Sequence, residues 1–136
     1  MEKVKFSKVE RNFYTNYLVR AEECLSAAKN SISRSQWNAS AISAIHCGIA
    51  LLDALCVYYL GQRHAGQNHE DAVTIFRNIM QLEREDIDTI ANRVIKILKM
   101  KNTVEYEERL VRQIEAQDIL KNAERLLEAV KSNLPK

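Results

Sequence analysis

The stretch ASAISAIHCGIALLDALCVYYL, residues 39–60, decides the fold, because it is apolar nearly all round. It is also long enough to raise the alternative of a membrane span. However, Asp53 and His46 lie inside it, and an Asp near the middle of a span costs about 2.5–3.5 kcal/mol. We therefore expect a buried core helix over residues 36–60 and no membrane partner.

Apolar residues recur at spacings of three and four on both sides of this stretch, which is typical of helices that bury one face. The expected helices around the core helix cover residues 7–32, 69–82, 86–100 and 104–133. Ser7 with Glu10 three residues on has the pattern of a capping box, and no strand-like alternation is visible. The sequence predicts an all-α fold: an up-and-down antiparallel four-helix bundle with one extra short helix.

Length and composition indicate one domain over residues 1–136. The chain has 46% hydrophobic and 28% charged residues, with only three Gly and one Pro. So few helix breakers favour long helices over many short strands. The net charge of +2 is too small to indicate a nucleic-acid partner by itself.

The three cysteines predict a reducing, cytoplasmic location. Cys24, Cys47 and Cys56 are odd in number and form no CxxC pair. We expect buried, inert thiols, no metal site and no cofactor. The N-terminal residues carry no apolar signal-peptide core.

The polar segment GQRHAGQN, residues 61–68, follows the core helix and carries Arg63 and His64, with His69 directly after it. A guanidinium can grip a phosphate with two parallel hydrogen bonds, and an imidazole exchanges protons near neutral pH. These residues would suit a phosphodiester site. The alternative is a set of polar side chains in an exposed loop.

Four further residues are candidates for supporting roles. His46 and Asp53 are seven residues apart and share one face of the core helix, where they either fix Arg63 or His69 or serve as structural polar groups. Tyr106, with Lys101 and Asn102, forms the other wall of the site or else a packed helix start. Asn68 contacts a phosphate or ribose, or caps the helix that opens at His69.

The run AISAIHCGIALLDALCVYYLGQRHAGQNHEDAVTIF, residues 41–76, resembles the HEPN superfamily of small helical-bundle proteins. The superfamily motif is an Arg, then Asn, Asp or His, then a few residues, then His. Arg63, His64 and His69 match it in order and spacing, and the likeness extends from Ala39 to the C-terminus.

The resemblance implies a metal-independent endoribonuclease, in which the RNA 2′-OH attacks the adjacent phosphate and leaves a 2′,3′-cyclic phosphate. On that reading His69 is the general acid or base, Arg63 stabilises the phosphate and transition state, and His64 orients substrate. One motif holds one catalytic His, so a homodimer would bring two together around one RNA groove.

Two departures from the superfamily pattern weaken the nuclease interpretation. Some toxin-like members carry a Tyr two residues after the His, which a nucleotidyltransferase partner modifies; here that position is Asp71, so this regulation is not expected. Glu70 and Asp71 would also repel RNA phosphates. The alternative function is a non-catalytic dimeric interaction module, partnered with a nucleotidyltransferase or another protein.

Overall fold

The computed structural model describes residues 5–66 and 68–136. Helices dominate, which confirms the predicted all-α class. In chain order the elements are β1 (Phe6–Lys8), the 3-10 turn η1 (Arg11–Phe13), α1 (Tyr14–Ser33), α2 (Trp37–Leu60), β2 (Gln62–His64), α3 (Glu70–Phe76), α4 (Arg84–Tyr106) and α5 (Gln113–Ser132).

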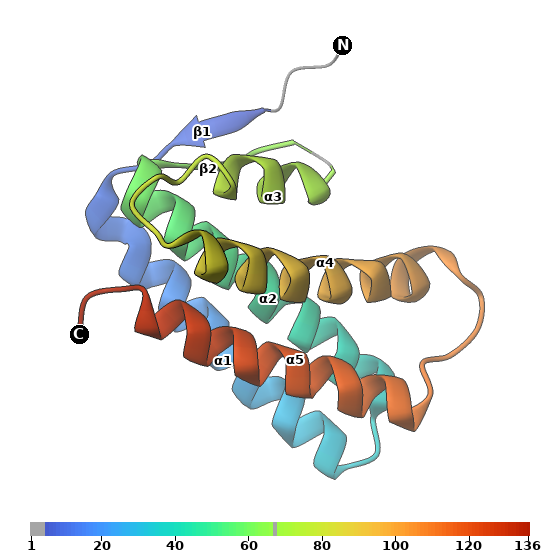
Figure 1. Cartoon of the computed structure of the whole chain (residues 1–136). Helices are drawn as coiled ribbons and strands as arrows, with labels where there is room; N and C mark the ends of the chain where they lie inside the picture. The colour runs from blue at the N-terminus through green and yellow to red at the C-terminus, as the bar shows by residue number, and fades with distance from the viewer. Residues whose placement is uncertain (1–4, 67) are drawn as a thin grey trace.

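Helix α2 is the centre of the bundle. It packs against α1, α4, α5 and the short α3. In Figure 1, α1 and α2 run side by side in opposite directions. Helices α4 and α5 lie in front of this pair, and both pack against α2. The short elements α3, β1 and β2 gather at one end of the bundle, where α2 finishes (Figure 1). The short extra helix therefore covers the end of the core helix that leads into residues 61–69, which we call the Arg–His segment.

The apolar surface of α2 is covered by the other helices, as a core helix requires. Leu51, Leu52 and Leu55 are almost fully buried. By length and composition the helix could cross a membrane, but 78% of its most apolar window is buried inside the protein. The prediction of a buried core helix is confirmed.

Two small residues of α2 set how closely its neighbours approach. Ser40 is fully buried, and its Oγ donates a hydrogen bond to the Ala28 carbonyl of α1 at 2.9 Å. A Cβ added at Gly48 would lie 3.1 Å from Cγ2 of Ile97 on α4. The absence of a side chain at Gly48 therefore leaves the space that the Ile97 side chain occupies.

Three predicted helix boundaries are wrong. The first helix begins at Tyr14 rather than Ser7, so Ser7 and Glu10 form no capping box; Glu10 is extended, with φ −60° and ψ 137°. The short helix ends at Phe76 instead of residue 82. The last helix begins at Gln113, because residues 104–106 finish α4 and the chain is extended at both Glu107 and Arg112.

The prediction of no strands is also wrong, because β1 and β2 form an antiparallel pair. Phe6 faces His64 and Ser7 faces Arg63 in this pairing. Backbone bonds extend it at both ends, from Val9 N to Gly61 O at 2.9 Å and from Ala65 N to Lys5 O at 3.0 Å. Residues 62–64 are therefore held as a strand by the N-terminal segment, which we call the N-terminal clip (residues 5–9).

Candidate functional site

Arg63 and His64 are consecutive residues of β2, so their side chains leave the strand on opposite sides. Arg63 is half-buried, and its guanidinium carbon lies 5.9 Å from the centre of the Tyr17 ring on α1. His64 is buried, with 6% of its surface exposed. The Arg63 side chain thus points toward α1, and the His64 side chain points into the protein.

Asp53 is a buried carboxylate of α2 within electrostatic reach of Arg63. Burial raises the pKa of Asp53 to about 6, while the Arg63 and Arg20 guanidiniums act in the opposite direction. Arg20 also lies over the Tyr17 ring, at 5.2 Å. The α1 side of the site therefore contains two guanidiniums, one phenol ring and one buried carboxylate.

His64 and His69 lie close together, with ring centroids 5.6 Å apart. Burial lowers the pKa of His69, and the Lys101 ammonium and His64 lower it further, against Glu105, which raises it. Burial also lowers the pKa of His64, while nearby Asp71 raises it. Both imidazoles are therefore predominantly neutral at pH 7.

The buried Nε2 of His64 has no hydrogen-bond partner among residues 5–66 and 68–136. A Cβ added at Gly66 would lie 3.2 Å from this same nitrogen. The missing side chain of Gly66 therefore leaves room for the His64 ring to sit under the turn.

His69 opens onto a polar pocket of about 270 Å³ between the Arg–His segment and the end of α4. The residues that line it are Asn68, His69, Glu70, Leu98, Lys101, Asn102 and Tyr106. Lys101 is mostly buried, and its Nζ donates to Oε2 of Glu105 at 2.7 Å. The pocket thus combines an imidazole, an ammonium, a carboxylate, two amides and a phenol.

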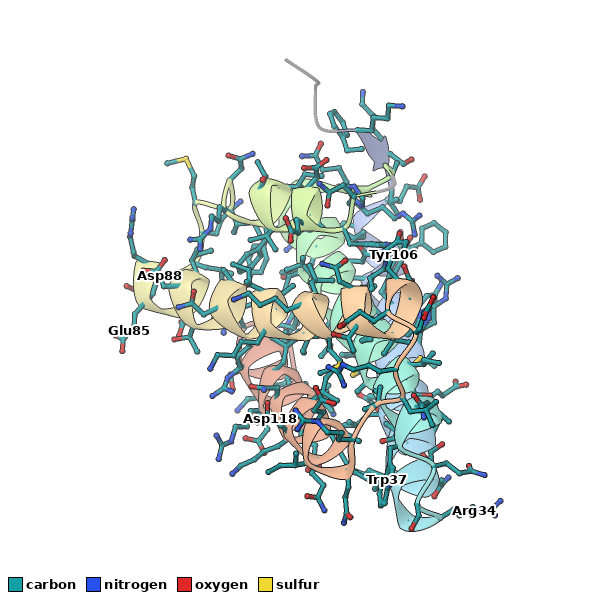
Figure 2. All side chains as sticks on the ribbon, turned by 90° about the vertical axis from the view of Figure 1, so that its right-hand side faces the viewer. Arg34, Trp37, Glu85, Asp88, Tyr106 and Asp118 are labelled. Atoms are coloured by element: carbon teal, nitrogen blue, oxygen red, sulfur yellow. The ribbon has the colours of Figure 1, made fainter. Side chains whose placement is uncertain are left out.

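Tyr106 is the last residue of α4 and is 75% exposed. Figure 2 shows its side chain projecting outward at that end of the helix. The alternative of a packed tyrosine at a helix start is therefore wrong. The structure places Tyr106, Lys101 and Asn102 on the α4 wall of the His69 pocket.

His46 and Asp53 lie near different members of the Arg–His segment. His46 is exposed on α2 and is close enough to His69 to lower the pKa of its imidazole slightly. Asp53, two turns further along the same helix, acts on Arg63 instead. One face of α2 therefore has a polar side chain near each of the two motif residues, His46 near His69 and Asp53 near Arg63.

Asn68 makes a local contact of the capping kind. Its Oδ1 accepts a hydrogen bond from the Glu70 backbone N–H at 3.0 Å, and its carbonyl accepts one from Asp71 N–H at 3.0 Å. These bonds fix the first turn of α3, which places the His69 side chain over the pocket.

Sequence reasoning missed Tyr17 and Arg20, and it considered Glu70 only as a carboxylate that repels phosphate and not as part of the pocket wall. Tyr17 and Arg20 are three residues apart on α1, so they share a helix face, but only the packing of α1 on α2 brings that face to Asp53. Across the two described ranges, no group of three or more His, Cys, Asp or Glu side chains gathers in a way that could hold a metal ion.

A helical bundle whose core helix leads into a strand-held Arg–His segment defines the class of protein: a small all-α domain with a paired basic and imidazole site. The family model described as the HEPN domain matches residues 14–133, which run from the start of α1 to the residue after α5. The chain belongs to the HEPN family. No curated protein is similar enough in sequence to count as a match.

Proposed function

We propose that this protein is a metal-independent endoribonuclease that acts on RNA as a homodimer through Arg63 and His69, in a reducing cytoplasmic setting. The observation that supports it best is the environment of His69. A neutral imidazole faces a polar pocket beside the Lys101 ammonium, so it can accept a proton next to a bound phosphate.

The proposed reaction needs one base, one acid and a cation. Neutral His69 takes the proton of the RNA 2′-OH as the 2′ oxygen bonds to the adjacent phosphorus. The bond from phosphorus to the 5′ oxygen of the next nucleotide breaks, and that oxygen takes a proton from a protonated imidazole. Arg63 offsets the charge that develops on the phosphoryl oxygens. A second copy of His69, in a dimer, would supply the acid.

The test is cleavage of unstructured RNA in EDTA by the purified protein. His69→Asn and Arg63→Ala should each lower the cleavage rate, with the loss at His69 on the order of 10²–10⁴-fold. The matched control is Arg34→Ala, since Arg34 lies in the turn after α1 at the opposite end of the bundle (Figure 2). Equal cleavage by wild type and His69→Asn, or none by wild type, would remove the nuclease proposal.

A second candidate function is a non-catalytic interaction module, with a nucleotidyltransferase or another protein as partner. The observation that favours it is apolar exposure in and after the end of α4: Leu110 is 75% exposed and Ile114 68% exposed. Leu110 lies in the connection between α4 and α5 and Ile114 in the first turn of α5, and such exposed apolar side chains suit a protein interface. Leu110→Asp should then abolish oligomer formation or partner binding in light scattering, while wild type binds no RNA.

A further inference from the structure

We propose that the pocket between His69 and the last turn of α4 is a base-binding subsite that selects bases with an exocyclic amino group and disfavours uracil. This inference rests on the proposed action on RNA and names the part of the substrate that this site would recognise. It would make the protein selective for single-stranded RNA at adenine, cytosine or guanine.

The pocket has the size for one base rather than for a longer segment. Its volume of about 270 Å³ lies just under the range of about 300–1,000 Å³ typical of pockets for drug-sized ligands. A base inside it would have the His69 imidazole at its edge. The scissile phosphate would then lie next to the recognised nucleotide.

Tyr106 provides the stacking surface. Tyr106 is 75% exposed and borders the pocket, so it is accessible to a ligand bound there. RNA-binding proteins recognise unpaired bases by stacking them on such rings. The end of α4 is therefore suited to hold the flat face of one base.

Glu70 and Asn102 provide the edge contacts. An ionised carboxylate only accepts hydrogen bonds, whereas an amide both donates and accepts. Adenine N6 and cytosine N4 are amino donors at the position where uracil has its O4 acceptor, and guanine carries its amino donor at N2. Glu70 would therefore accept from an amino group and repel the uracil oxygen, and Asn102 would complete the pairing.

Lys101 provides the phosphate contact. Its ammonium is held at the pocket by Glu105 at 2.7 Å and lies near enough to His69 to lower the imidazole pKa. A phosphate that binds beside His69 would therefore also meet Lys101. This arrangement fixes the base subsite on the α4 side of the reacting phosphate, away from Asp53 and Arg20.

The test measures binding of the single-stranded oligonucleotides A10, C10 and U10 by fluorescence anisotropy, using the full chain with His69→Asn so that no RNA is consumed. We expect tighter binding of A10 and C10 than of U10. Tyr106→Ala should weaken the binding of A10 and C10 by about 5- to 150-fold, which is the effect of losing one stacked base. Tyr106→Phe should restore the affinity for both.

Glu70→Gln separates base reading from simple charge repulsion. Loss of the negative charge would strengthen binding of all three oligonucleotides, but only base reading predicts that U10 gains more than C10. The matched control is Met80→Ala, because Met80 is 91% exposed and precedes α4, whereas Tyr106 ends it. This control should change no affinity.

The outcomes separate this inference from the nuclease proposal. Equal affinity for the three oligonucleotides, unchanged in Tyr106→Ala, overturns the subsite even if the wild type cleaves RNA. Base-selective binding that Tyr106→Ala abolishes supports the subsite, even where the wild type cleaves nothing and the nuclease proposal fails. No RNA binding by either His69→Asn or wild-type protein overturns both.

Discussion

His69 has charged or titratable neighbours on three elements: Lys101 and Glu105 from α4, His64 from β2 and His46 from α2. Burial and the neighbouring cations lower its pKa, and Glu105 alone in that set raises it. Burial therefore has the largest effect on the protonation of the proposed base, and among its charged neighbours Lys101 of α4 has the largest.

Replacing Lys101 with Met should raise the His69 pKa, because the nearest cation that opposes imidazole protonation is removed. Glu105→Gln should lower it, because the only neighbour that favours the protonated ring is lost. The measurement is an NMR titration of the His69 ring protons. Identical titration midpoints in the two variants would contradict this account of the pocket.

The buried Asp53 carboxylate should make the free energy of unfolding depend on pH. Its folded-state pKa of about 6 lies above the ordinary value of 3.8, because burial disfavours the charged carboxylate. The stability that neutral Asp53 contributes is thus fully present below pH 3.8 and is lost as the pH rises to about 6. The loss amounts to about 3 kcal/mol at most.

Asp53→Asn removes this titration. Its free energy of unfolding relative to wild type should therefore improve as the pH rises from 4 to 7, by up to about 3 kcal/mol. Urea denaturation of both proteins across that range measures the difference. If the carboxylate also restrains Arg63, RNA cleavage should fall in the variant that is the more stable at pH 7. A pH-independent stability difference would contradict the burial argument.

At the scale of elements, the contact of α2 with α4 depends on Gly48. The Ile97 side chain is 1% exposed, so it is enclosed on all sides, and a Cβ only 3.1 Å from its Cγ2 would press against it. Gly48→Ala should therefore destabilise the protein by about 1–2 kcal/mol, since overpacking outweighs the gain in helix propensity of about 1 kcal/mol.

A double-mutant cycle checks this explanation. Ile97→Ala opens space opposite residue 48, so Gly48→Ala should cost less in the Ile97→Ala background than in the wild type. Thermal or urea unfolding of the four proteins gives the coupling energy. Additive effects would mean that Gly48 is needed for a reason other than close contact with Ile97.

The sequence predicts those elements that local pattern specifies. The core helix follows from an unbroken apolar run, and the Arg–His segment from its contrast with that run. The boundary between α4 and α5 could not be predicted from the sequence, because no Gly or Pro occurs between residues 67 and 134 to mark it. A continuous amphipathic pattern allows either end point.

The β1–β2 pairing and the α1 side of the site were beyond local pattern altogether. β1 has three exposed residues and no alternation, so it becomes a strand only because β2 lies beside it. Tyr17 and Arg20 approach Asp53 and Arg63 only once α1 has packed on α2. The sequence named Tyr106 as a site residue, but it did not predict that Tyr106 ends α4, because the boundary between α4 and α5 was predicted wrongly.

At the scale of the whole molecule, the cysteines report on the integrity of the core. Cys47 and Cys56 are buried on α2, and burial raises the pKa of Cys47 to about 12, while Cys24 is only partly buried. Iodoacetamide should therefore modify Cys24 first in the native protein and the other two only on global unfolding. Mass mapping with and without urea measures this order; equal labelling in native buffer would contradict a close-packed core.

The N-terminal clip has a consequence for the order of assembly. Its partner strand follows the whole of α1 and α2 in the chain, so the pairing closes a long loop that gains little until those helices have docked. The helical bundle can therefore reach nearly its full helix content while Arg63 and His64 still lack their strand. Circular dichroism would report a finished fold at that moment, and the ordering of the candidate site would follow as a later, separately timed event.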